Sequence, residues 1–130
     1  MPAILMQHDE DPAKVITKSV GDLKDIIIFG NFVLVGIYER PEKTKGGLIL
    51  TDRTRAEEKS QGKAAMILKK GPFAFVSDLN YDFRGQNVAI GDWVAIFVSD
   101  GRSITINGWV CRLVEDQYIR LKIPAPDVVY

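Results

Sequence analysis

ERPEKTKGGLILTDRTRAEEKSQGKA, residues 39–64, places a short aliphatic run inside a charged segment with glycines close by. The run is Leu48, Ile49 and Leu50, and no other large aliphatic residue lies between Arg40 and Gln61. A segment this polar cannot offset the entropy of its own ordering by burying apolar surface. We therefore expect residues 40–61 to form a mobile loop whose aliphatic centre binds a partner.

A hairpin is the alternative interpretation of the same residues. Gly46 and Gly47 supply the positive φ angles that a tight turn requires, and residues 48–51 then form a short core strand. A short apolar run does not by itself distinguish these two structures. The surrounding charges favour the exposed loop.

From residue 25 onward the pattern predicts β-structure. Short runs rich in β-branched and aromatic residues alternate with turn residues, and Asn107-Gly108 between two such runs is a strong hairpin signal. The predicted strands cover residues 26–29, 32–38, 63–69, 88–90, 93–98, 103–106, 109–114 and 119–123. Many short strands at this spacing predict an all-β fold, a small barrel.

The two ends of the chain have a different character. Asp11 followed by Pro12 is typical of a helix start, apolar residues then recur at helical spacing, and Gly21 can end the helix. Residues 124–130 are a proline-containing apolar tail. We expect three parts: an N-terminal extension arm with a short helix over residues 1–25, a β-barrel domain over 26–123, and a C-terminal tail over 124–130.

Composition and residue types argue against an enzyme. Cys111 and His8 are the only cysteine and histidine, so no metal-ligand set is recognisable, and no phosphate-binding glycine motif occurs. We expect His8 to be a solvated side chain and Cys111 to be a buried, inert thiol. A lone cysteine fits a reducing compartment. No catalytic residue, metal or other cofactor is predicted.

Charge and hydropathy exclude two further classes of partner. Lys plus Arg and Asp plus Glu number 17 each, so no general electrostatic attraction to nucleic acid or to an anionic membrane is expected. No apolar run is long enough to span a membrane, and residues 1–11 lack the features of a secretory signal. The aromatic segment over residues 71–85 is predicted to pack in the core or to contact another subunit.

The order of the motifs carries a family resemblance. A strand over residues 32–38 leads to Gly46-Gly47-Leu48-Ile49-Leu50-Thr51, and a charged return stretch then ends at Gly62. A later strand follows Ile90-Gly91-Asp92 and ends near Asp100-Gly101. Together these features, over residues 26–123, resemble the small co-chaperonin family typified by GroES.

This resemblance implies a fold, an assembly and a partner. Members of the family are β-barrels that form sevenfold rings, and each subunit offers its mobile loop to a large chaperonin ring. The resemblance makes Leu48, Ile49 and Leu50 the anchoring tripeptide, with Gly46, Gly47 and Thr51 beside them in the partner-binding motif. It also implies a heptameric homo-oligomer in which strand 26–35 of one subunit pairs with strand 119–123 of the next.

The chain departs from the family in its N-terminal extension, its aromatic segment and its tail, which makes it more similar to divergent bacteriophage-encoded versions. Two functions follow. The first is a lid for an ATP-dependent folding chamber in the cytoplasm, a host cytoplasm for a phage protein, with a phage capsid protein as one client. The second is a virion decoration or assembly protein that retains the barrel. The intact aliphatic motif favours the first, and the two terminal arms favour the second.

Overall fold

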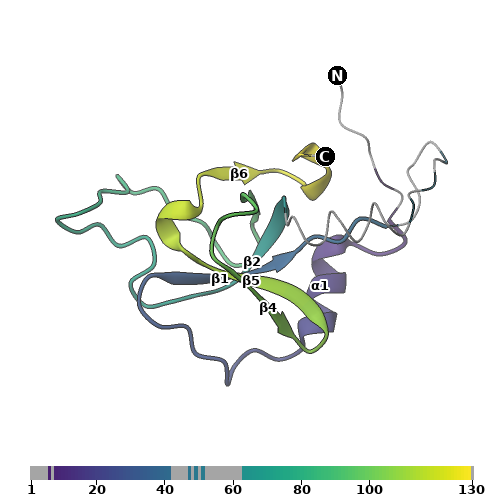
Figure 1. The fold of residues 1–130 in the computed structure, drawn as a ribbon, viewed down its shortest axis with the longest axis horizontal. Helices are drawn as coiled ribbons and strands as arrows, with labels where there is room; N and C mark the ends of the chain where they lie inside the picture. The colour runs from purple at the N-terminus through teal and green to yellow at the C-terminus, as the bar shows by residue number, and fades with distance from the viewer. Residues whose placement is uncertain are drawn as a thin grey trace.

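The protein, seen here as a computed structural model, is built on one antiparallel β-sheet (Figure 1). The structure describes Met6, residues 8–41, Gly47, Ile49, Thr51 and residues 63–129. The strands are β1 (Phe32–Ile37), β2 (Ala64–Lys70), β3 (Trp93–Ala95), β4 (Arg102–Ile106), β5 (Trp109–Glu115) and β6 (Leu121–Ile123). The helical elements are α1 (Pro12–Val20) and two 3₁₀-helices, η1 (Asp116–Tyr118) and η2 (Pro126–Val129).

The six strands follow the order β4-β5-β1-β2-β3-β6 across the sheet, and each neighbouring pair is antiparallel. In the described residues β4 and β6 are the two edges, so the sheet is open. The predicted β-architecture with one short N-terminal helix is therefore confirmed. The predicted closing of the sheet into a barrel is not.

Both faces of β1 are buried, because successive side chains of a strand point to opposite sides of the sheet. Val33, Val35 and Ile37 lie in one apolar cluster with residues of β2, β3 and β5. Leu34 lies in a second cluster that also contains the buried side chains of α1. β1 is consequently the central strand of the core, and it is paired on both sides, with β2 and β5.

Helix α1 begins and ends where the sequence predicts. The side chain of Asp11 accepts a hydrogen bond from the backbone N–H of Ala13 at 3.0 Å, Pro12 occupies the first turn, and Gly21 ends the helix at φ 73°. Ile16 and Val20 are buried against the sheet. The predicted N-terminal extension thus contributes two side chains to the second apolar cluster.

The strand predicted over residues 26–29 is wrong. The Ile26 N–H donates to the carbonyl of Leu23 at 3.0 Å, and the Phe32 N–H donates to the carbonyl of Phe29 at 3.3 Å. Turns therefore bound this segment on both sides, and it joins no sheet strand in the part of the chain that is described. Its β-branched residues satisfy the pattern of a strand, yet the side chains of Ile27 and Phe29 are exposed.

The strand predicted over residues 88–90 is also wrong. The carboxylate of Asp92 accepts a hydrogen bond from the Ala89 N–H at 2.8 Å, and the Asp92 N–H donates to the Ala89 carbonyl at 3.0 Å. These bonds close a turn over the residues that would have paired. By contrast, Asn107 and Gly108 have φ angles of 50° and 84° and join β4 to β5, which confirms the predicted hairpin.

Candidate partner-binding site

Half of the predicted partner-binding motif is described by the structure. Gly47 has a φ of 88°, a conformation that favours glycine, and Ile49 is 62 % exposed. Thr51 is exposed as well. Gly46, Leu48 and Leu50 lie outside the described residues, so partner binding by this motif stays a prediction.

The connection that carries this motif has its two ends side by side. It leaves the sheet after β1 and returns into β2, and these strands are adjacent and antiparallel. The Tyr38 N–H donates to the Ala64 carbonyl at 2.9 Å, which continues the strand pairing one residue beyond β1. Residues 39–63 therefore start and finish at one point on the sheet.

A cluster of three polar side chains fixes the first end of this connection. The Tyr38 hydroxyl donates to Asp127 Oδ1 at 2.6 Å, and His8 Nε2 lies 3.2 Å from both Asp127 Oδ2 and the Tyr38 hydroxyl oxygen. We call His8, Tyr38 and Asp127 the terminal clasp. It joins the N-terminal extension, the residue after β1, and the C-terminal tail.

The buried polar groups of the terminal clasp have hydrogen-bond partners. Asp127 is buried in η2, and its Oδ2 also accepts a hydrogen bond from the Met6 N–H at 3.2 Å. A buried carboxylate is costly unless donors surround it, and charge-assisted bonds are the stronger ones. The Tyr38 ring is itself buried and packs edge-on against Trp93, with the ring centroids 5.8 Å apart.

The expectation that His8 is a solvated side chain is therefore wrong. Its side chain is only 23 % exposed, and its imidazole ring contacts groups that lie 30 and 119 residues further along the chain. No local sequence signal marks this role, because a histidine next to charged residues is typical of the surface. Only the folding of both chain ends onto β1 brings these partners together.

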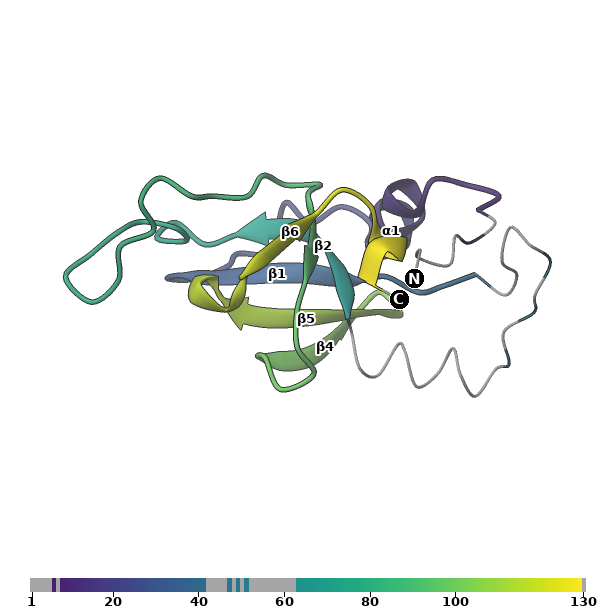
Figure 2. The same ribbon diagram turned by 90° about the horizontal axis from the view of Figure 1, so that it is seen from above.

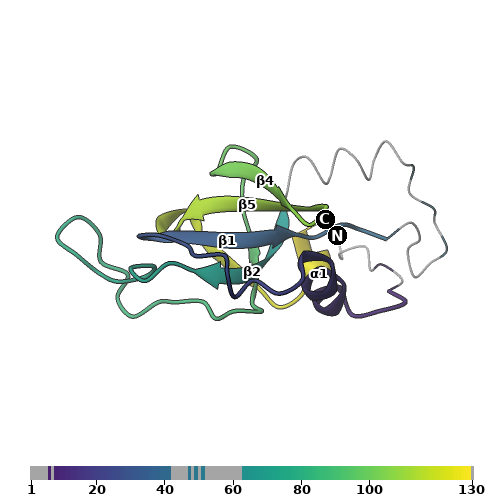
Figure 3. The same ribbon diagram turned by 90° about the horizontal axis from the view of Figure 1, so that it is seen from below.

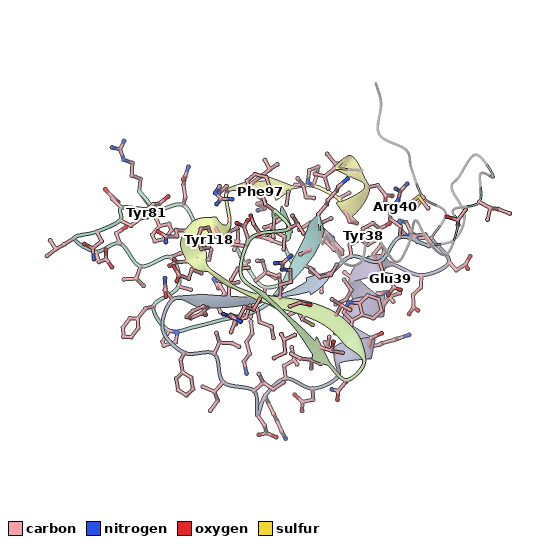
Figure 4. The ribbon with its side chains drawn as sticks, in the orientation of Figure 1. Tyr38, Glu39, Arg40, Tyr81, Phe97 and Tyr118 are labelled. Carbon is pink, nitrogen blue, oxygen red and sulfur yellow. The ribbon has the colours of Figure 1, made fainter. Side chains whose placement is uncertain are left out.

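A pocket with a volume of about 410 Å³ opens next to the terminal clasp. Val15 and Ile16 of α1, together with Trp109 of β5, provide apolar lining, and Arg40 lines the pocket as well. The Arg40 side chain is buried, and its Nη2 lies 3.3 Å from the sulfur of Met6. Figure 4 shows Tyr38, Glu39 and Arg40 grouped beside α1 and η2.

Cys111 is a core residue, as the sequence predicts. Its side chain is fully buried in the cluster that includes α1, and burial raises the pKa of the thiol to about 11. A thiol this far from ionisation at neutral pH is a poor nucleophile. In the described ranges, no three His, Cys, Asp or Glu side chains come together as a metal site, and no helix could span a membrane.

The aromatic segment over residues 71–85 is a loop with two kinds of side chain. Phe83 is buried, and Phe75 packs against both Phe83 and the first core cluster. Phe73 and Leu79 are exposed. Figure 2 shows this loop at one end of the molecule and α1 with η2 at the other.

Asp116 anchors this loop to the sheet. Its buried carboxylate accepts hydrogen bonds from the Phe75 N–H at 2.9 Å, from Asn31 Nδ2 at 3.1 Å and from the Gln117 N–H at 2.7 Å. These donors belong to three separate segments of the chain. The loop is consequently held in a defined position although much of its surface is exposed.

Comparison with known proteins adds no family assignment. No protein-family model matches the chain, and no curated protein sequence matches it.

Proposed function

We propose that this protein is a co-chaperonin, a lid that caps a large chaperonin ring through Leu48, Ile49 and Leu50 and so assists ATP-dependent folding of other proteins. The observation that carries the proposal is the exposed side chain of Ile49, at the centre of a charged connection between two adjacent strands. Contiguous exposed apolar groups mark interaction sites, and the sequence places Ile49 between two further large aliphatic residues in this charged segment.

The energetics of one loop favour weak binding. Burying three large aliphatic side chains yields about 5–9 kcal/mol in total. Ordering a loop of about twenty residues costs roughly 1 kcal/mol or more for each residue, which can consume this gain. Several loops on one ring bind tightly together, because later contacts become intramolecular. The proposed function therefore requires a homo-oligomeric ring, as the family resemblance implies.

The sheet edges bear on how such a ring would assemble. Among the described residues β6 is an edge strand, and segment 26–29, which exposes Ile27 and Phe29, has the composition of a strand but joins none. We propose that these two segments pair between subunits and so complete a GroES-like barrel wall. The resemblance implied pairing over residues 26–35, but residues 33–35 cannot pair with another subunit, because β2 and β5 already pair with them on both sides.

A virion structural protein is the second candidate. The observation that favours it is the apolar surface at the end of the molecule opposite α1 and η2, where Leu79 and Phe73 are exposed on a loop that Asp116 holds in place. A decoration or assembly protein would use such a surface to contact its neighbours in the particle.

Two measurements on the intact chain separate these functions. Sedimentation velocity should show a closed oligomer, and a monomer at all concentrations would contradict the ring. Size-exclusion chromatography with a chaperonin ring should show co-elution when nucleotide is present. Absence of co-elution, together with recovery of the chain in purified particles, would replace the lid by the structural role.

A further inference from the structure

We infer that the terminal clasp positions the partner loop, so that the two ends of the chain and the start of this loop order and loosen as one unit. The proposal assigns His8 and Asp127 as positioning residues that act through Tyr38. Its consequence for partner binding rests on the proposed function, whereas its structural part does not.

Asp127 is the centre of the unit because both of its carboxylate oxygens are used. Oδ1 accepts from the Tyr38 hydroxyl, and Oδ2 accepts from the Met6 N–H and contacts His8 Nε2. The carboxylate is buried, so water cannot replace a lost partner at little cost. Loss of one bond in such a network weakens the others, since each bond polarises its neighbours.

Tyr38 connects the terminal clasp to the start of the predicted loop. Tyr38 directly follows β1, and the predicted loop begins two residues later, at Arg40. Arg40 also contacts the N-terminal segment through Met6. The same short N-terminal stretch thus contacts the start of the loop at two points, and the C-terminal tail holds that stretch in place. Figure 3 shows η2, in yellow, at the same end of the sheet as α1 and the end of β1.

A fixed loop start lowers the entropic cost of binding, because those residues are already ordered before the partner arrives. Without the clasp, the residues at the start of the loop would have to be ordered on binding, which weakens the affinity. We expect the affinity of a single loop for its partner to fall by about three- to tenfold, the range that corresponds to the net contribution of one intramolecular hydrogen bond. A ring of subunits should amplify this loss.

The first test is amide hydrogen exchange on the full-length chain carrying Tyr38→Phe. This variant removes one hydroxyl and keeps the ring that packs on Trp93. Exchange should become faster together in residues 8–11, 38–41 and 126–129 and stay unchanged in β5. Tyr118→Phe, far from the clasp beside β6 (Figure 4), is the matched control and should change none of these segments.

Faster exchange confined to residues 38–41, faster exchange that extends through β5, or no change would each overturn the inference. If Tyr38→Phe does not fold, His8→Ala tests the same coupling, because it removes a partly exposed corner of the clasp. It should loosen residues 38–41 and 126–129 together.

The second test measures binding of the same variants to a nucleotide-loaded chaperonin ring. Tyr38→Phe and His8→Ala should bind more weakly, while Ile96→Val, which perturbs the other core cluster, should bind as the wild type does. Equal binding of wild type and clasp variants would overturn the positioning role. Failure of the wild type itself to bind would refute the proposed function, and the exchange experiment would still decide whether the three segments are coupled.

Discussion

Replacing Gly36 by alanine places a methyl group in the contact between α1 and β1. A Cβ atom on Gly36 would lie 2.7 Å from Ile16 Cγ2 and 3.1 Å from Leu68 Cδ1. The Cγ2 atom of a helical isoleucine cannot swing aside, because its χ1 rotamer is strongly restricted. Gly36→Ala should therefore push α1 away from the sheet or strain both partners.

The size of this effect follows from the packing. Overpacking a close contact lowers the free energy of unfolding by about 1–3 kcal/mol. Alanine has less conformational entropy than glycine in the unfolded chain, which offsets about 0.4–1 kcal/mol of this loss. Ile16→Ala alone should cost about 2–5 kcal/mol, since Ile16 is buried and leaves a cavity. In the double variant the new methyl group fills part of that cavity. We expect its free energy of unfolding to exceed the additive value by about 1–3 kcal/mol.

Urea denaturation of the wild type, the two single variants and the double variant measures this coupling. Val20→Ala with Gly36→Ala is the matched control, because Val20 lies one turn further along α1 and does not appear among the atoms closest to the Gly36 Cβ position. Free energies that add within about 0.5 kcal/mol for the Ile16 pair would refute the packing of α1 on β1. Such additivity would also support residues 1–25 as an arm separate from the core.

Two further predictions concern buried polar and thiol groups. Asp116→Ala should lower the free energy of unfolding by about 1–3 kcal/mol and speed amide exchange in residues 73–87, because Asn31 and the Phe75 N–H lose their acceptor. The surface control Asp9→Ala should do neither, and equal exchange in both variants would contradict the anchoring role. Burial raises the pKa of Cys111 from 9.0 to about 11, so the thiol of the unfolded chain ionises first and the free energy of unfolding should fall as the pH rises from about 9 to 11. Cys111→Ala should lack that part of the fall, and an identical pH dependence of the two proteins would contradict this prediction.

Local signals in the sequence predicted the local structure well. Asp11, Pro12 and Gly21 determine the bounds of α1 through bonds and φ angles within a few residues. Asn107-Gly108 likewise specifies the β4–β5 turn, because both positions require positive φ. These features depend on neighbouring residues only, so the pattern carries enough information.

Features that depend on distant residues were missed or misjudged. Residues 26–29 have the composition of a strand, but a strand forms only where the fold brings the segment to a pairing partner, and this segment is bounded by turns and joins no strand among the described residues. The terminal clasp joins His8 to groups 30 and 119 residues away, which no periodicity can indicate. The aliphatic triplet at residues 48–50 could be proposed as a binding motif from sequence because it contrasts with its own neighbours, but the contacts of the terminal clasp could not.

Capture by a nucleotide-loaded chaperonin ring tests the central claim most directly. The comparison uses the wild type, a variant with Leu48→Ser, Ile49→Ser and Leu50→Ser, and a Leu79→Ser control that changes an exposed aliphatic residue of the aromatic segment. We predict that the wild type and Leu79→Ser are captured equally and that the triple variant is not, while all three unfold at the same urea concentration. Undiminished capture of the triple variant would contradict the account.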